Sequence, residues 1–231
     1  MMVCDTFAFL HLHKSGGTFV NRMMVQCIAS TQRIGYHLPY GELPQDYRAL
    51  PILGTVRNPW SYYVSWYHFQ HAQENPNPLF RLCSQDKALD FAATVTRLAG
   101  LQGDDRLIDQ LIDVFPNHFV SYGLNLTKAC LAPIRGSGLG FYTFLHDRLY
   151  AGAPSPRIIP MENLRENLAG VPLGLRPREA SLVRQYLAMM PSLNVSQHGR
   201  YQDYYTPQLQ ALIATLDKPV IDAYGYRFDA S

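Results

Sequence analysis

Short apolar runs and longer amphipathic segments alternate along the chain. Residues 3–11, 51–56 and 157–161 are short runs rich in Val, Ile, Leu and Phe, and 33–36 is a further short extended segment. Uninterrupted apolar runs of this length are typical of strands that are buried on both faces. The pattern therefore predicts four strands spread over most of the sequence.

Helical spacing of apolar residues follows these strands. After the first strand, one apolar face is expected from Val20, Met23, Met24, Cys27 and Ile28. Asn58-Pro59 and Thr206-Pro207 each combine a capping side chain with a proline suited to a first helical turn. Further helices are predicted at 87–98, 106–114, 141–150, 178–189 and 219–224. Strands that alternate with helices predict an α/β fold with a mainly parallel sheet covered on both faces.

The bulk composition adds limits to this picture. The 231 residues are 47% hydrophobic and 16% charged, which suits one domain, and the formal net charge of +2 gives no general basic surface for nucleic acid. No apolar run approaches the ~20 residues of a membrane span, and the first residues do not resemble a secretion signal. The four cysteines are scattered, so we expect reduced thiols and a cytoplasmic location.

The first segment with clear chemistry lies between a predicted strand and a predicted helix. It reads His13-Lys-Ser-Gly-Gly-Thr18. Adjacent glycines let the backbone turn several N–H groups toward one anion, and the helix N-terminus adds positive potential. The ammonium of Lys14 and the hydroxyls of Ser15 and Thr18 can complete a phosphate or sulfate site around Gly16 and Gly17.

The order of residues in this loop separates two classes of nucleotide-binding protein. In a Walker A loop the lysine follows the glycines, whereas Lys14 precedes Gly16 and Gly17. This order disfavours an ATPase, a GTPase or a kinase of the Walker type, although a P-loop-like kinase remains an alternative. A plain glycine turn beside a surface lysine is the simpler alternative.

A second segment follows the strand at 51–56 and reads Val56-Arg-Asn-Pro-Trp-Ser-Tyr-Tyr-Val-Ser-Trp-Tyr-His68. The guanidinium of Arg57 and the hydroxyl of Ser65 are suited to holding a second phosphate. A salt bridge for Arg57 and a solvated position for Ser65 are the alternatives. Since neighbouring parallel strands end at the same edge of a sheet, both segments are expected to border one crevice.

Together, the two segments resemble the nucleotide-binding elements of PAPS-dependent sulfotransferases, particularly the carbohydrate and bacterial branch. The K-[ST]-G-G-T order matches the loop for the 5′-phosphosulfate, and R-[DN]-P-x-x-x-x-x-S matches the 3′-phosphate element. The resemblance is clearest over 7–71 and weaker at 158–164 and 201–228. It implies a P-loop-NTPase-like three-layer α/β/α fold around a mainly parallel sheet, in one sulfotransferase domain over 1–231. It also implies metal-independent transfer of a sulfuryl group from 3′-phosphoadenosine 5′-phosphosulfate (PAPS).

The resemblance also suggests roles for residues outside the two segments. His37 lies in the segment that matches the one whose histidine serves as general base in several carbohydrate sulfotransferases, with Glu42 as an orienting group or an alternative base. A loop histidine that makes a structural hydrogen bond is the alternative for His37. Arg200, in Gln197-His-Gly-Arg-Tyr201, is the candidate for completing the 3′-phosphate site, and an ordinary surface arginine is the alternative. The segment at about 75–153 matches no family motif, so we expect a helical insertion that binds the acceptor.

We expect the acceptor to be a hydroxyl of a carbohydrate or small molecule. A non-catalytic protein that binds a nucleotide with the same residues is the alternative from a different functional class.

Overall fold

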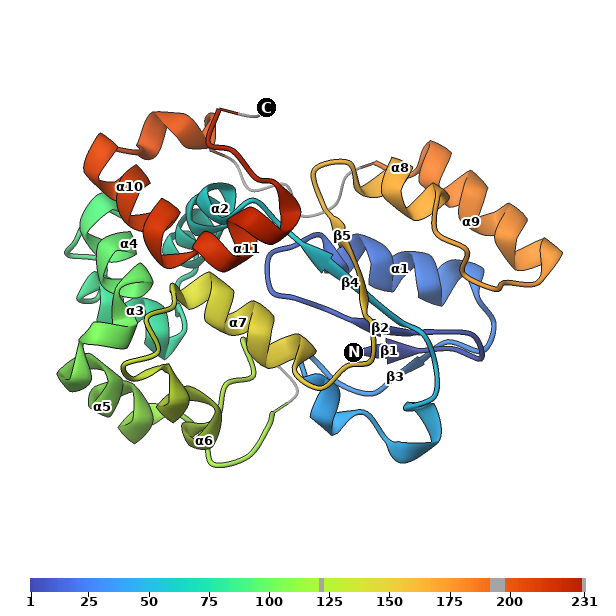
Figure 1. Cartoon of the computed structure of the whole chain (residues 1–231), viewed down its shortest axis with the longest axis horizontal. Helices are drawn as coiled ribbons and strands as arrows, with labels where there is room; N and C mark the ends of the chain where they lie inside the picture. The colour runs from blue at the N-terminus through green and yellow to red at the C-terminus, as the bar shows by residue number, and fades with distance from the viewer. Residues whose placement is uncertain (121–122, 192–197, 230–231) are drawn as a thin grey trace. The chain divides into compact units, whose positions relative to one another are not determined.

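The computed structural model describes residues 1–120, 123–191 and 198–229 (Figure 1). The chain divides into two compact units. The first unit comprises Met1–Arg57 with Arg148–Val195, and the second comprises Asn58–Asp147 with Ser196–Ser231.

The first unit contains a five-stranded sheet. Its strands are β1 (Met2–Val3), β2 (Ala8–Leu10), β3 (Gln32–Arg33), β4 (Ile52–Val56) and β5 (Arg157–Pro160), in the order β3-β1-β2-β4-β5. β2, β4 and β5 are mutually parallel neighbours, and β1 pairs antiparallel with both β2 and β3. Four strands therefore run in one direction, which confirms an α/β fold with a mostly parallel sheet.

The first predicted strand is wrong in one respect. Residues 3–11 do not form a single strand, because the chain reverses between β1 and β2 in a tight turn. In that turn the N–H of Cys4 donates to the carbonyl of Phe7 at 3.0 Å, and Asp5 is exposed. Asp5 and Thr6, two polar residues inside the apolar run, were the sequence signal for this hairpin. The second predicted strand is also displaced, since β3 covers Gln32–Arg33 rather than 33–36.

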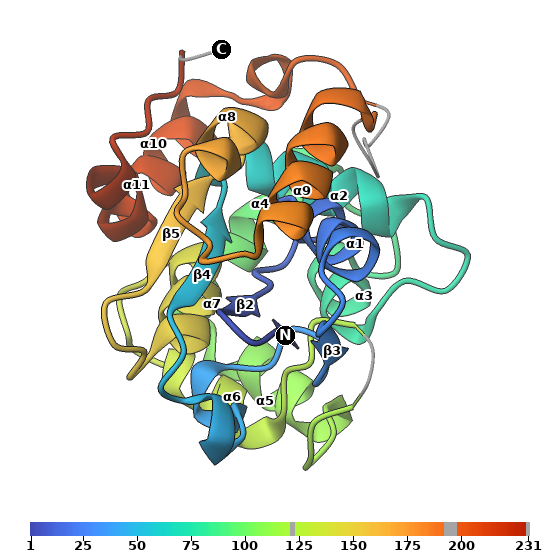
Figure 2. The same cartoon turned by 90° about the vertical axis from the view of Figure 1, so that its right-hand side faces the viewer.

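Three helices cover one face of this sheet, as Figure 2 shows. They are α1 (Gly17–Cys27), α8 (Leu164–Ala169) and α9 (Pro177–Met189). Phe9, Leu53 and Ile159 come from the three parallel strands and pack into the same apolar core as the inner faces of these helices. The predicted apolar face of α1 is confirmed, whereas α8 was not predicted.

On the sheet, Tyr150 packs against Gly54 of β4. A Cβ at Gly54 would lie 2.3 Å from the Tyr150 hydroxyl oxygen, so only glycine fits there. That hydroxyl accepts from the N–H of Thr55 at 3.1 Å and donates to the Thr55 carbonyl at 3.0 Å. Tyr150 ends α7 (Phe141–Tyr150), and the boundary between the units falls within this helix.

The described part of the second unit is helical. Besides most of α7, it contains α2 (Pro59–His71), α3 (Pro78–Ser84), α4 (Phe91–Ala99), α5 (Asp105–Val114), α6 (Lys128–Leu131), α10 (Pro207–Leu216) and α11 (Lys218–Tyr224). Short 3₁₀ turns accompany them, including η5 (Tyr201–Tyr204). None of the described helices is both long and apolar enough to cross a membrane.

Helix starts in the second unit follow the predicted capping chemistry. The Asn58 side chain accepts from the backbone N–H groups of Trp60 and Ser61, and Thr206 accepts from Leu209. The helix predicted at 87–98 starts late, because Asp90 caps it and Phe91 is its first residue. The helix α3, which Asn77 caps, was not predicted, because the polar residues before Pro78 indicated a loop.

The segment at 75–153 is rich in helix, but its expected role as an acceptor-binding insertion stays a prediction. The expectation of a single sulfotransferase domain over 1–231 likewise stays a prediction.

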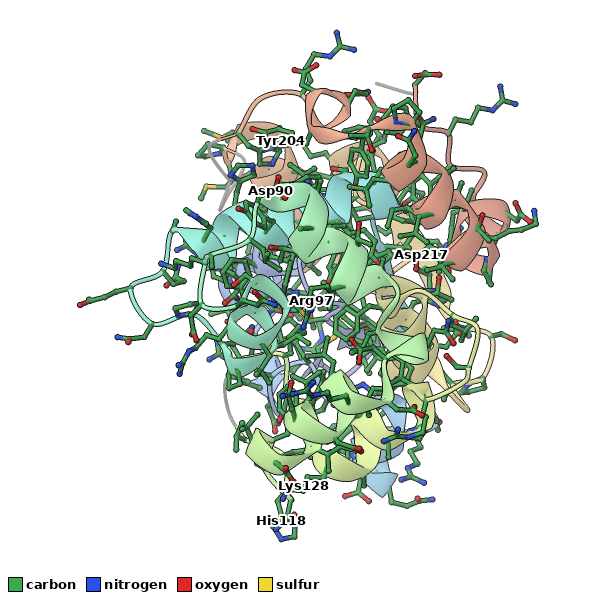
Figure 3. All side chains as sticks on the ribbon, turned by 90° about the vertical axis from the view of Figure 1, so that its left-hand side faces the viewer. Asp90, Arg97, His118, Lys128, Tyr204 and Asp217 are labelled. Carbon is green, nitrogen blue, oxygen red and sulfur yellow. The ribbon has the colours of Figure 1, made fainter. Side chains whose placement is uncertain are left out.

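A buried carboxylate links the junction of α10 and α11 to α2 and α7 in the second unit. Asp217, between α10 and α11, is fully buried and is labelled in Figure 3. Its Oδ2 accepts from the Tyr63 hydroxyl at 2.8 Å, and its Oδ1 accepts from the N–H and the hydroxyl of Thr143, each at 2.8 Å. Gly140 leaves the space for this carboxylate, since a Cβ there would lie 2.5 Å from Oδ1. Burial raises the pKa of Asp217 from 3.8 to about 6, although these hydrogen bonds oppose the rise.

Replacing Asp217 with Ala should destabilise the protein by about 3–5 kcal/mol, because it leaves buried donors of Tyr63 and Thr143 without an acceptor. Asp217→Asn should cost less, since its amide oxygen can still accept from Thr143.

Because the folded-state pKa of Asp217 is raised, the folded protein holds this proton more tightly than the unfolded chain does. As the pH rises from about 4 to about 6, the free energy of unfolding of the wild-type protein should therefore fall relative to that of Asp217→Asn. Urea denaturation at each pH measures this difference. Parallel curves for the two proteins would contradict the assignment.

Candidate functional site

The glycine loop connects β2 to α1 and has an unusual backbone. Lys14 has φ of 55° and Gly16 has φ of 80°, so two residues of this short turn adopt the left-handed conformation. A lysine rarely adopts this conformation, and such strain is common at binding sites. The hydroxyl of buried Ser15 donates to the His13 carbonyl at 3.2 Å, which holds the turn closed.

Close packing requires glycine at position 17, and the left-handed backbone favours it at position 16. A Cβ at Gly17 would lie 1.8 Å from Cδ2 of His11, and a Cβ at Gly16 would lie 3.0 Å from Cδ2 of Leu164. Gly17 therefore lets α1 begin directly against the imidazole of His11. Gly16 lets the loop approach the segment after β5, where the sequence resembled the sulfotransferase pattern.

Arg57 joins the second motif to the first. β2 and β4 are parallel neighbours with Leu10 opposite Gly54, so the residues that follow both strands emerge at one edge of the sheet. From there, Nη1 of Arg57 donates to the backbone carbonyl of Lys14 at 3.1 Å. The structure thus brings together Arg57 and the Lys14–Thr18 loop, as the sequence predicted.

The two cations affect each other. The pKa of Lys14 falls from 10.5 to about 8, first because of burial and then because of the charge of Arg57. Two positive groups held this close favour a bound anion, which would relieve their repulsion. Backbone N–H groups at the start of α1 add to this potential.

His37 lies at the same end of the first unit as the glycine loop, and its backbone is strained. Its φ is 46°, its ring is buried, and its carbonyl accepts from Nη2 of Arg148 at 3.2 Å. Its Nδ1 lies 2.7 Å from the carbonyl oxygen of His11. Since a carbonyl can only accept, Nδ1 carries the proton and Nε2 carries a lone pair. That tautomer is the one required of a general base acting through Nε2.

Burial is the main cause of the low pKa of His37, which is about 4. The charges of the Met1 amino group and of Arg148 lower it further, and the bond to the His11 carbonyl opposes the change. The imidazole is therefore neutral at pH 7 with a lone pair on Nε2, and burial makes it a weaker base than an exposed histidine. Arg148 was not foreseen, because nothing in its own sequence segment distinguishes it from other arginines at helix ends.

His37 belongs to a cluster of three histidines. Its ring centroid lies 4.4 Å from that of His11 and 5.3 Å from that of His13. Burial lowers the pKa of both neighbours well below the usual 6.5. Glu42, the alternative base, is exposed on η1 (Tyr40–Glu42), and the hydrogen bond that orients His37 is the one that it donates to the His11 carbonyl.

Two predicted site residues belong to the second unit. Ser65 is buried within α2, and Arg200 is exposed immediately before η5. Thr18 is half-buried in the first turn of α1. Gln197, at the start of the Arg200 segment, lies outside the described residues. The expected contributions of Ser65 and Arg200 to a 3′-phosphate site stay predictions.

Comparisons with other proteins add no assignment to this geometry. No protein-family model matches the chain, and no curated protein is significantly similar to it in sequence. Within the described residues, no group of three or more His, Cys, Asp or Glu side chains is arranged to hold a metal ion. The functional argument therefore depends on the loop, Arg57 and His37.

Gly17→Ala should destabilise the first unit by about 1–3 kcal/mol, because its methyl group would overlap the His11 ring. Combining it with His11→Ala should recover part of that loss, so thermal unfolding of the four proteins of a double-mutant cycle should show coupling. Gly41→Ala is the matched control, since a Cβ at Gly41 meets nothing within 4 Å. Additive effects of Gly17→Ala and His11→Ala would contradict the packing described.

Proposed function

We propose that the protein is a sulfotransferase that transfers a sulfuryl group from PAPS to a hydroxyl of a carbohydrate or small-molecule acceptor. The observation that carries the proposal is the hydrogen bond from Arg57 to the carbonyl of Lys14. It joins two motifs that the sequence linked separately to the two phosphate groups of PAPS. The strand–loop–helix unit beside a parallel β4 supports the further proposal of a P-loop-NTPase-like fold.

Sulfuryl transfer needs an acceptor oxygen and a leaving phosphate oxygen nearly in line. The acceptor oxygen forms the new S–O bond as the bond from sulfur to the bridging phosphate oxygen breaks. The leaving phosphate keeps that electron pair, and the charge that develops on it is stabilised by Lys14, the loop N–H groups and Thr18. The acceptor proton passes to Nε2 of His37. All atoms and charges are then accounted for without a metal ion.

Substrate binding and transfer test this proposal directly. Isothermal titration should show binding of adenosine 3′,5′-bisphosphate without Mg²⁺, and labelled PAPS should donate sulfate to a member of a panel of sugars, phenols and small alcohols. Binding of ATP with Mg²⁺ in place of the bisphosphate would favour a kinase. Binding of the bisphosphate with no transfer to any acceptor would favour a non-catalytic nucleotide-binding protein.

Lys14→Ala should lower turnover by at least ~10²-fold, because removing one group that stabilises a developing oxyanion typically costs that much. Arg57→Lys should mainly weaken binding of the bisphosphate, since lysine keeps the charge but cannot reproduce the guanidinium contacts. Lys218→Ala is the matched control, because Lys218 is exposed and pairs only with Asp222 among the described residues. Near-normal turnover of Lys14→Ala would exclude the loop from the reaction.

His37→Ala should reduce turnover by ~10²- to 10⁴-fold while leaving affinity for the bisphosphate nearly unchanged. In the wild-type enzyme, kcat/KM should rise with pH as His37 loses its proton near pH 4. It should fall again as Lys14 loses its charge near pH 8. His118→Ala, at an exposed residue that projects from the second unit (Figure 3), is the control. An unchanged acid limb in His37→Ala would remove His37 from the mechanism.

A further inference from the structure

His11 lies between the proposed base and the phosphate loop. Its backbone carbonyl accepts from Nδ1 of His37, and the two rings are 4.4 Å apart. A displacement of His11 would therefore rotate or release the ring of His37. The orientation of the base therefore depends on the contacts that hold His11 in place.

The side chain of His11 is fixed by α1. Its Cδ2–Nε2 edge packs on Gly17, and its Nδ1 lies 3.3 Å from Nδ2 of Asn21, one helical turn further along. Residues separated by one turn share a face of a helix. The imidazole is thus held at two points by the helix whose N-terminus forms the anion site.

The two bonds require opposite tautomers at neighbouring histidines. An Asn21 amide that donates to Nδ1 of His11 leaves the proton on Nε2, the edge that faces Gly17. His37 carries its proton on Nδ1 instead. Burial lowers the pKa of His11 well below 6.5, so the neutral form is maintained at pH 7.

Asn21 has an unusual hydrogen-bonding state. Its buried Oδ1 has no hydrogen-bond partner within the described residues, so the contact with His11 is the side chain's one hydrogen bond there. Leaving a buried amide oxygen unpaired is costly, so each such group needs an explanation. Asn21 lies on α1 beside His11, and a role in positioning His11 would explain the unpaired oxygen.

We propose that Asn21 and His11 are positioning residues that couple the phosphate loop to the general base. Asn21 fixes the tautomer and orientation of His11, and the His11 carbonyl in turn holds His37 with Nε2 available. Binding of an anion at the N-terminus of α1 then changes the environment of the His37 ring, and the change passes through Gly17, Asn21 and His11. This inference rests on the proposed function for its substrate, but its geometry is testable without catalysis.

Nitrogen NMR of the histidine side chains tests the coupling in the full-length protein. At pH 7 His11 should be protonated on Nε2 and His37 on Nδ1. Addition of adenosine 3′,5′-bisphosphate should shift the His37 ring resonances and leave those of exposed His118 unchanged. In Asn21→Leu, binding should persist while the His37 response is lost and its tautomers become mixed. Gln26→Leu, at an exposed position on α1, should behave as wild type.

Steady-state kinetics give a second readout. Asn21→Leu should lower kcat by about 10- to 100-fold with little change in the KM for PAPS, because a misplaced base slows the chemical step alone. Asn21→Ser is the second variant if the leucine variant does not fold.

The outcomes separate this inference from the proposed function. A bisphosphate that does not bind to wild type contradicts the sulfotransferase proposal, and the tautomers of the free protein then test the inference alone. The inference is overturned if His37 keeps its Nδ1–H tautomer unchanged in the Asn21 variants. It is also overturned if the nucleotide binds and moves the His37 resonances equally in wild type and Asn21→Leu.

Discussion

The parallel pairing of β2 with β4 is the constraint on which the candidate site depends. With Leu10 opposite Gly54, the segments that follow both strands leave the sheet at one edge, and Arg57 reaches the carbonyl of Lys14. A shift of this register by one residue would send alternate side chains to the opposite face of the sheet. The cation of the loop and the guanidinium of Arg57 would then no longer lie together.

Several features of the fold were predictable because they depend on local chemistry. The Asn58-Pro59 and Thr206-Pro207 starts specify their helices through a capping oxygen and a fixed φ, and both are confirmed. The apolar spacing in α1 similarly identifies its buried face. The β1–β2 hairpin was missed because one long apolar run suits one strand or two, and only its central polar pair marks the reversal. Cap-plus-proline at Asn77-Pro78 was also missed, since neighbouring polar residues suggested a break.

The candidate site was predictable to a similar extent. The loop and Arg57 come from short motifs that each follow a strand, so the sequence could bring them together through the sheet. His37 came from the resemblance, but the group that orients it did not. Its partner is the carbonyl of His11 rather than Glu42, and main-chain partners have no sequence signature. Arg148 was missed for a related reason, because its contact with the carbonyl of His37 joins residues far apart in sequence.

Burial explains why the groups of the site have the charge states that transfer would need. Three neighbouring histidines could carry three positive charges beside Lys14 and Arg57, which would hold an anion tightly but leave no base. Desolvation lowers the pKa of all three, so they remain neutral at pH 7. The positive charge at this end of the first unit then comes from Lys14, Arg57 and Arg148, while His37 keeps a lone pair on Nε2. The same buried environment therefore separates the binding of an anion from the acceptance of a proton.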